Sequence, residues 1–227
     1  MRPVLDEILS QAERKTKAVS RQMALLKWMA QAENNEETMR QALAWEESCE
    51  RLTLLARSLP VYTWCPRAKE ESLRVTKAEV PVDIGFTAEK WFCVRLPLLL
   101  PKKESGSADY IRSFLYPAMR DFFDGRPPVR YRDCVLIYRH VYDRRRPERQ
   151  MRDHDNIEMN MVTDIVAMYV MPDDGPSVCS HYYCSAAAET ERTEVYIVPR
   201  TEFPVWLFCE RKMPEEGVEL YETQQEA

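Results

Sequence analysis

The chain has 227 residues, of which 45% are hydrophobic and 30% charged, and its formal net charge is −5, which excludes uniform charge-driven binding to nucleic acid. No stretch approaches the ~20 apolar residues of a membrane span, and the N-terminal segment lacks the apolar centre of a signal peptide. The seven cysteines include no Cys-x-x-Cys spacing, which indicates reduced thiols, so we expect a cytoplasmic protein.

Two long helices are predicted first, over residues 4–31 and about 36–59. In each, apolar residues recur at helical spacing without glycine or internal proline. Asn34-Asn35 predicts the turn between them, and Pro60 ends the second helix. Residues 1–60 therefore predict an antiparallel helical hairpin. Its apolar stripe must be covered, so the hairpin is expected to bind the rest of the chain, a second copy of itself or another protein.

A mixed α+β domain is predicted over residues 91–213, after an irregular connector over 61–90 and before an acidic tail over 214–227. Its element order is strand, helix, strand, helix, strand, strand. We expect the last two strands to pair as a hairpin. The expected elements lie at 91–100, 108–123, 133–142, 156–170, 178–185 and 193–198.

Two charge blocks of opposite sign adjoin in this domain. Residues 126–152 hold nine arginines against three acidic residues, and residues 153–174 hold six acidic residues without lysine or arginine. Guanidinium groups pair with phosphate in a bidentate manner, so the first block is typical of contact with a nucleic-acid backbone. The predicted nucleic-acid-binding residues are Arg144, Arg145, Arg146, Arg149, Arg152, Lys102 and Lys103.

The acidic block has the chemistry of a divalent-metal site. Asp153 and Asp155 precede the helix predicted at 156–170, and Asp173-Asp174 follow it. Mg²⁺ takes carboxylate oxygens as ligands, and a bound ion polarises a phosphate and activates a water. Because a helix of that length spans about 22 Å, its two ends meet only across a dimer or if the second acidic pair folds back.

Three motifs follow one another here: Arg-Asp-His-Asp-Asn at 152–156 before the helix, Asp-Asp at 173–174 after it, and Thr-Glu-Val-Tyr-Ile-Val at 193–198. Their order resembles that of the RusA-type Holliday junction resolvases, over about residues 91–200. The resemblance implies a dimeric, Mg²⁺-dependent endonuclease that cuts branched DNA. It also implies Asp153, Asp155 and Asp174 as metal ligands, Asn156 as a brace for the site and Asp164 as the mid-helix aspartate.

One departure from the family concerns a lysine one turn into the helix. Met159 and Asn160 occupy that turn here, and neither carries the charge that stabilises a developing negative charge on phosphate. Lys102 or Lys103 is a possible substitute. The alternative function is therefore a catalytically degenerate module of the same fold that binds nucleic acid or mediates assembly.

Each of these residues also has an interpretation in which its role is purely structural. Asp155 with Glu158 three residues later is a helix-capping pattern, Asp173-Asp174-Gly175-Pro176 is an ordinary turn sequence, and Asp164 is also explained as a solvated polar position. The arginine run is also compatible with a solvated loop, and the whole chain with a helical-hairpin adaptor. A zinc site from Cys179, His181 and Cys184 is disfavoured, because Cys184 faces the opposite side of the predicted strand. Of the histidines, His154 is the functional candidate.

Overall fold

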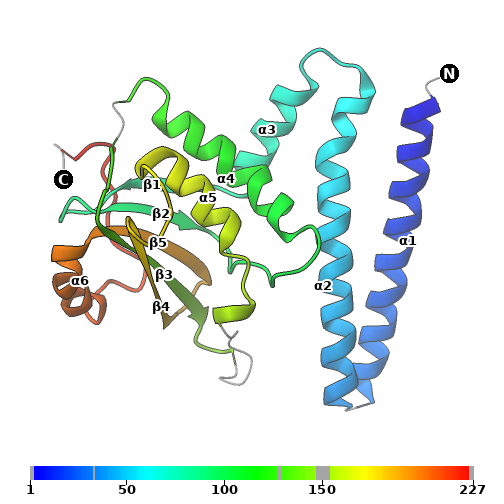
Figure 1. Cartoon of the computed structure of the whole chain (residues 1–227). Coiled ribbons are helices and arrows are strands. Elements are labelled where there is room, and N and C mark those ends of the chain that lie inside the picture. Colours follow the sequence, from blue (N-terminus) through cyan, green and yellow to red (C-terminus); the bar gives the residue numbers. More distant parts are fainter. Residues whose placement is uncertain (1–2, 33, 127–128, 147–153, 225–227) are drawn as a thin grey trace. The chain divides into compact units, whose positions relative to one another are not determined.

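The computed structural model describes residues 3–32, 34–126, 129–146 and 154–224, apart from the side chains of residues 3 and 155 (Figure 1). The fold is α+β, as predicted. Two compact units are present, Met1–Thr76 and Lys77–Ala227, and the boundary falls within helix α3 (Ala68–Glu79). Within the described ranges, none of the helices has the length and apolar character needed to cross a membrane.

The first unit is built on two long antiparallel helices, α1 (Pro3–Gln31) and α2 (Asn35–Ser58) (Figure 1). The Asn34 side chain starts α2 by accepting a hydrogen bond from the Glu37 backbone N–H at 3.1 Å. No residue of α2 is buried. Exposed apolar side chains on the two helices include Leu25, Trp28, Met39 and Leu43. Other apolar residues of the two helices, such as Leu5, Ile8 and Leu52, are half-buried, so the apolar stripe is partly covered.

A five-stranded mixed sheet forms the centre of the second unit, in the order β1-β2-β5-β3-β4. β3 pairs in parallel with β4 and antiparallel with β5, and β2 joins β5 to β1 by antiparallel pairs. β5 is the middle strand, and seven of its eight residues are buried in succession. The strands are β1 (Asp83–Phe86), β2 (Phe92–Leu96), β3 (Cys134–Asp143), β4 (Cys179–Ala188) and β5 (Arg192–Pro199).

Each face of the sheet has its own core, because alternate residues of a strand point to opposite faces. Helices α4 (Ser107–Phe123) and α5 (Asn160–Val170) cover one face, where Phe92, Leu136 and Ile197 lie in the larger core. Helix α6 (Phe203–Glu210) covers the other, where its Trp206 lies in the smaller core (Figure 1). The functional candidates lie around α5, on the first face.

Two expectations about chain organisation are wrong. Residues 61–90 are not irregular, since they contain most of the 3-10 helix η1 (Leu59–Thr63) and all of α3 and β1. The last two strands do not form a hairpin, because β3 lies between them in the sheet. β4 is an edge strand whose residues alternate between covered and exposed, whereas β5 is covered on both faces.

Part of the acidic tail packs against the sheet. The backbones of Phe86 and Tyr221 exchange two hydrogen bonds of 2.8 Å, which adds a short segment beside β1. Gly85 permits this approach, because a Cβ atom there would lie 2.6 Å from the Tyr221 carbonyl oxygen. The tail thus covers one outer edge of the sheet.

Candidate functional site

The segment with the predicted metal ligands lies between β3 and α5. Asp153, Arg149 and Arg152 fall outside the residues that the structure describes. The chain continues in a 3-10 turn, η3 (His154–Asn156), which contains the backbone of Asp155. The structure therefore locates the second half of the Asp-x-Asp-Asn motif at the entrance to α5.

The loop after β2 lies beside this turn. The Lys103 backbone N–H donates a hydrogen bond of 3.1 Å to the Asn156 carbonyl, and Lys102 forms an isolated β-bridge with Ile157. Both lysines come from a distant part of the sequence. The fold brings their backbone next to the motif, where the sequence had offered them as a substitute for the family's lysine.

Helix α5 begins at Asn160, four residues later than predicted. Its N-cap residue is Met159, which makes no side-chain cap bond, and the Glu158 side chain accepts a hydrogen bond of 3.2 Å from the Met161 backbone N–H. The prediction that Asp155 caps the helix is therefore wrong. Met159, at the position before the helix, is buried in the larger core.

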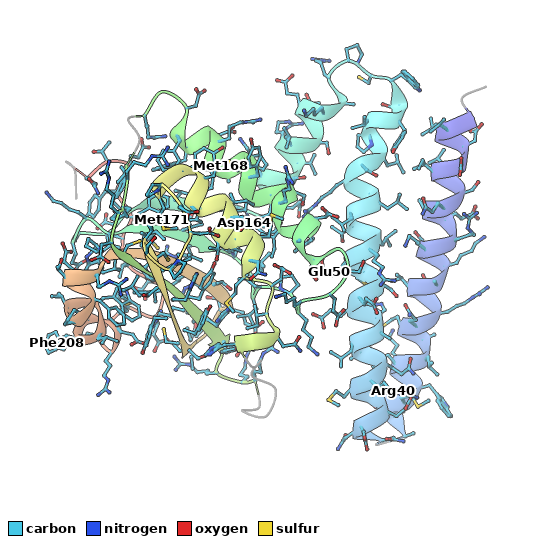
Figure 2. All side chains as sticks on the ribbon, in the orientation of Figure 1. Arg40, Glu50, Asp164, Met168, Met171 and Phe208 are labelled. Carbon is cyan, nitrogen blue, oxygen red and sulfur yellow. The ribbon has the colours of Figure 1, made fainter. Side chains whose placement is uncertain are left out.

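A pocket of about 430 Å³ lies along the exposed side of α5 and the turn that follows it. Figure 2 shows Asp164 and Met168 on α5 and Met171 beyond its end. Partial burial raises the pKa of Asp164, and the negative charges of Asp174 and Glu158 raise it further. The pocket is lined by Arg130, Asp164, Ala167, Met168, Met171, Pro172, Asp173 and Asp174.

The sequence left open how acidic residues from the two ends of the helix could come close to one another, and the pocket explains this for one of the two ends. The second acidic pair folds back along α5, so that Asp174 acts electrostatically on Asp164. Helix α5 has 11 residues, and its length is about 16 Å. Two of the predicted site residues, Asp164 and Asp174, are thus brought to one pocket, while Asp155 lies at the opposite end of the helix.

Arg130 is a pocket residue that the sequence did not single out. Its guanidinium donates hydrogen bonds to the carbonyls of Met171 at 2.7 Å and Met168 at 3.4 Å. A cation is favourable there, because the free carbonyls at the end of a helix carry partial negative charge. The sequence feature that could have pointed to Arg130 is its place in the basic block at 126–152. That block contains nine arginines, so it does not distinguish Arg130 from the others.

A turn follows α5, close to the predicted Asp173–Pro176 turn. The Asp174 backbone N–H donates to the Asp173 side chain at 3.0 Å, and the backbone N–H groups of Val178 and Cys179 both donate to the Gly175 carbonyl. The hydrogen-bonded turn therefore begins at Gly175, and the two aspartates precede it. This arrangement is compatible with the pocket, whose lining includes both aspartates.

Three predicted DNA-binding arginines are paired with carboxylates of the chain itself. Arg144 pairs with Glu215, Arg145 with Asp143, and Arg146 with Glu191. The hydrogen bonds from Arg145 lower the pKa of Asp143 to about 2. These pairs are exposed or half-buried, and such pairs contribute little to stability, so a phosphate can exchange with the carboxylate at small cost.

All three histidines of the chain lie in a row of rings on the α5 side of β3 and β4. His154 stacks on His140 and on Tyr183, with ring centroids 5.6 and 5.8 Å apart, and its Nε2 is 3.2 Å from the Ser185 hydroxyl. His181 stacks on the other side of Tyr183 at 6.3 Å. The row of rings extends from the turn that contains Asp155 to the neighbourhood of Asp174, whose negative charge acts electrostatically on His181.

The residues of the disfavoured zinc site do not come together in the structure. Cys179 belongs to the larger core and Cys184 to the smaller, on opposite faces of the sheet, so they cannot share one zinc ion. Within the described ranges, which leave out Asp153, no three His, Cys, Asp or Glu side chains form a group able to hold a metal ion.

The described residues define an α+β protein with a helical hairpin in one unit and an acidic pocket in the other. The chain belongs to a family of unknown function (DUF6100), whose model matches residues 2–224. This match extends over both units. No curated protein and no solved structure matches the chain.

Proposed function

We propose that this chain is a Mg²⁺-dependent endonuclease-like protein that acts on branched or structured DNA as a homodimer. The observation that carries the proposal is the pocket along α5, which gathers Asp164, Asp173 and Asp174 beside Arg130. The RusA-like order of motifs supports the same function, since it assigns the acidic residues of this region to phosphodiester cleavage.

The chemistry of the donors suits a hard cation. Asp164 has a raised pKa because partial burial and neighbouring carboxylates disfavour its charge, and a divalent ion relieves that repulsion. Asp153, Asp155 and Asp174 are the proposed ligands, Asn156 braces the turn, and Asp164 completes the acidic set. Because Asp155 and Asp174 lie at opposite ends of α5, they share one ion only across the proposed homodimer. When bound, Mg²⁺ supplies Lewis-acid activation of a phosphate and of a water.

The basic residues around the pocket have a positioning role in this proposal. Arg130 lies in the pocket itself, where its guanidinium is anchored by two backbone carbonyls. Lys102 and Lys103 flank the Asp155 turn. Arg144, Arg145 and Arg146 exchange their weak ion pairs for phosphate oxygens, and Arg149 and Arg152 extend the same run.

The test is Mg²⁺-dependent cleavage of a four-way DNA junction by the full chain. Asp155→Asn and Asp174→Asn should each reduce cleavage by about 100-fold, the usual effect of removing one preorganised charge from an active site. Glu104→Gln is the matched control, because Glu104 is an exposed carboxylate outside the proposed set. Unchanged cleavage in both aspartate variants would contradict the proposal.

A second candidate function is a catalytically degenerate module that binds nucleic acid or mediates assembly. Burial of the uncharged Met159 favours it, because this turn carries a lysine in the resembling family. Tight junction binding by the wild-type chain without cleavage selects this candidate. Absence of both binding and cleavage excludes both functions.

A further inference from the structure

Three sulfur atoms from three separate elements meet in the larger core. Cys134 is the first residue of β3, Cys179 is the first residue of β4, and Met171 follows the last residue of α5. All three are buried, with exposed fractions of 0%, 3% and 1%. The surrounding core is otherwise mainly hydrocarbon and aromatic, so the gathering of sulfur at one point is a distinct chemical feature.

Strand pairing sets the spacing of the two cysteines. Cys134 and Cys179 are direct partners in the parallel β3–β4 pair. Neighbouring strands lie about 4.8 Å apart, and both side chains point to the α5 side of the sheet. The Met171 thioether completes the group, with its Sδ 3.5 Å from the Cys134 Sγ.

The two thiols affect each other's ionisation. The hydrogen bond between them lowers the pKa of Cys179 and raises that of Cys134. The positive charge of Arg200 lowers the pKa of both, and its guanidinium is held by Asp133 and by the Ser180 hydroxyl. Cys179 is therefore the thiol of the pair that loses its proton more readily.

We propose that Cys134, Cys179 and Met171 form a binding site for one soft monovalent cation of the Cu(I) class. Thiolate and thioether donors select Cu(I) over hard ions such as Mg²⁺. A metal–sulfur bond of about 2.3 Å places three sulfurs around one ion roughly 4 Å apart, close to the 3.5 Å between Cys134 Sγ and Met171 Sδ. Binding displaces the thiol protons and changes no oxidation state, and Arg200 offsets the remaining negative charge.

The site has a structural consequence for the acidic pocket. The chain between Met171 and Cys179 is the turn that carries Asp173 and Asp174, and the Cys179 N–H is bonded to its Gly175 carbonyl. An ion held by both ends of this turn fixes its conformation. The inference does not depend on the proposed nuclease function, because its evidence is the sulfur geometry alone.

The test is competition for Cu(I) between the reduced full chain and a chromogenic Cu(I) chelator, without oxygen. The background carries Cys49→Ser, Cys65→Ser and Cys209→Ser, which removes the cysteines that are exposed or half-buried. We expect this background to hold one Cu(I) per chain. Cys179→Ser should abolish that binding. Cys93→Ser is the matched control, a buried cysteine in the other core that should leave it unchanged.

Met171→Leu keeps the volume of the side chain and removes its sulfur. We expect it to weaken Cu(I) binding by about tenfold, which corresponds to roughly 1.4 kcal/mol. Equal affinity in the background, the Cys179→Ser variant and the Met171→Leu variant overturns the proposal. So does the appearance of a Cys134–Cys179 disulfide in place of metal uptake.

A second measurement covers the case in which Cys179→Ser does not fold. Ag(I), a redox-inert ion of the same class, should slow alkylation of Cys134 and Cys179 in the otherwise unsubstituted chain, as read by peptide mass spectrometry. Cys93 should react at the same rate with and without the ion. Identical alkylation rates at all three cysteines overturn the proposal independently of the variants.

Discussion

The two units of this chain differ in how far they bury their apolar side chains. In the second unit, two cores close on the two faces of one sheet, and residues such as Phe92, Leu115 and Trp206 are fully buried. In the first, no residue of α2 is fully buried, and Trp28 of α1 has 61% of its surface exposed. The α/β unit thus has two closed cores, whereas the hairpin leaves several large apolar side chains exposed.

The largest difference between the units should appear when an apolar side chain is removed from each. Phe114→Ala opens a cavity in the core under α4, where Phe114 is 2% exposed, and should lower the free energy of unfolding by about 3–5 kcal/mol. Leu25→Ala in α1, where Leu25 is 39% exposed, should cost less than about 1 kcal/mol. Urea unfolding measures both. Equal losses would show that the hairpin has a closed core after all.

A smaller but still large difference is expected for charges. Glu194 is fully buried and accepts hydrogen bonds from Arg139 at 2.8 Å and Arg192 at 2.6 Å. Glu194→Gln leaves two buried guanidiniums without their counter-charge and should cost about 3 kcal/mol at neutral pH. Glu47→Gln, which breaks an exposed pair with Arg51 in the hairpin, should cost less than about 1 kcal/mol.

The same substitution predicts a change in pH dependence. Burial alone would raise the pKa of Glu194, but Arg139 and Arg192 together hold it below the ordinary 4.5. The stabilisation is therefore complete above 4.5 and is lost as the pH falls through the lowered pKa, because the unfolded chain takes up the proton first. Unfolding curves measured below pH 4.5 should be less pH-dependent for Glu194→Gln, and an unchanged slope would contradict this assignment.

The smallest expected effect lies in the hairpin turn. Asn34→Ala removes the hydrogen bond to the Glu37 N–H and should cost the first unit about 1 kcal/mol. Asn35→Ala is the matched control, because Asn35 is the first helical residue and its side chain makes no capping bond. Helical circular dichroism during urea unfolding compares the two. If Asn35→Ala loses as much as Asn34→Ala, the capping role is refuted.

Long elements with a strong pattern could be predicted from the sequence. The bounds of α1, α2 and α4 differ from the predicted ones by one residue at most, because each is a long periodic segment with clear ends. α3 escaped prediction because half of its residues are charged and leave a weak apolar stripe. β1 has four residues, too few for a period to be visible.

The sheet order could not be predicted in the same way. A connection of three residues separates β4 from β5, which favours a hairpin on local grounds. The continuous burial of β5, with Val195, Tyr196, Ile197 and Val198 all below 1% exposed, requires a central position instead. That choice depends on pairing with strands distant in sequence, which no local pattern contains.

In the candidate site as well, residues marked by a local sequence pattern could be predicted, whereas residues placed by long-range contacts could not. Aspartates were found because their spacing along the chain is visible in the sequence. Arg130 was missed because its place in the pocket depends on how the chain before β3 passes the end of α5. The charge of Asp174 raises the pKa of Asp164 because the chain after α5 folds back along the helix, and the sequence did not reveal that direction.

The central position of β5 has a consequence for synthesis on the ribosome. β2 and β3 are joined through β5, whose Ile197 pairs with both Phe92 and Leu136. A nascent chain that ends before Arg192 therefore holds two strands with no neighbour between them. Chaperone demand should peak during that interval and end once the middle strand leaves the exit tunnel, since unpaired strand edges promote aggregation. The hairpin, emerging first and relying on contacts close in sequence, has no such delay.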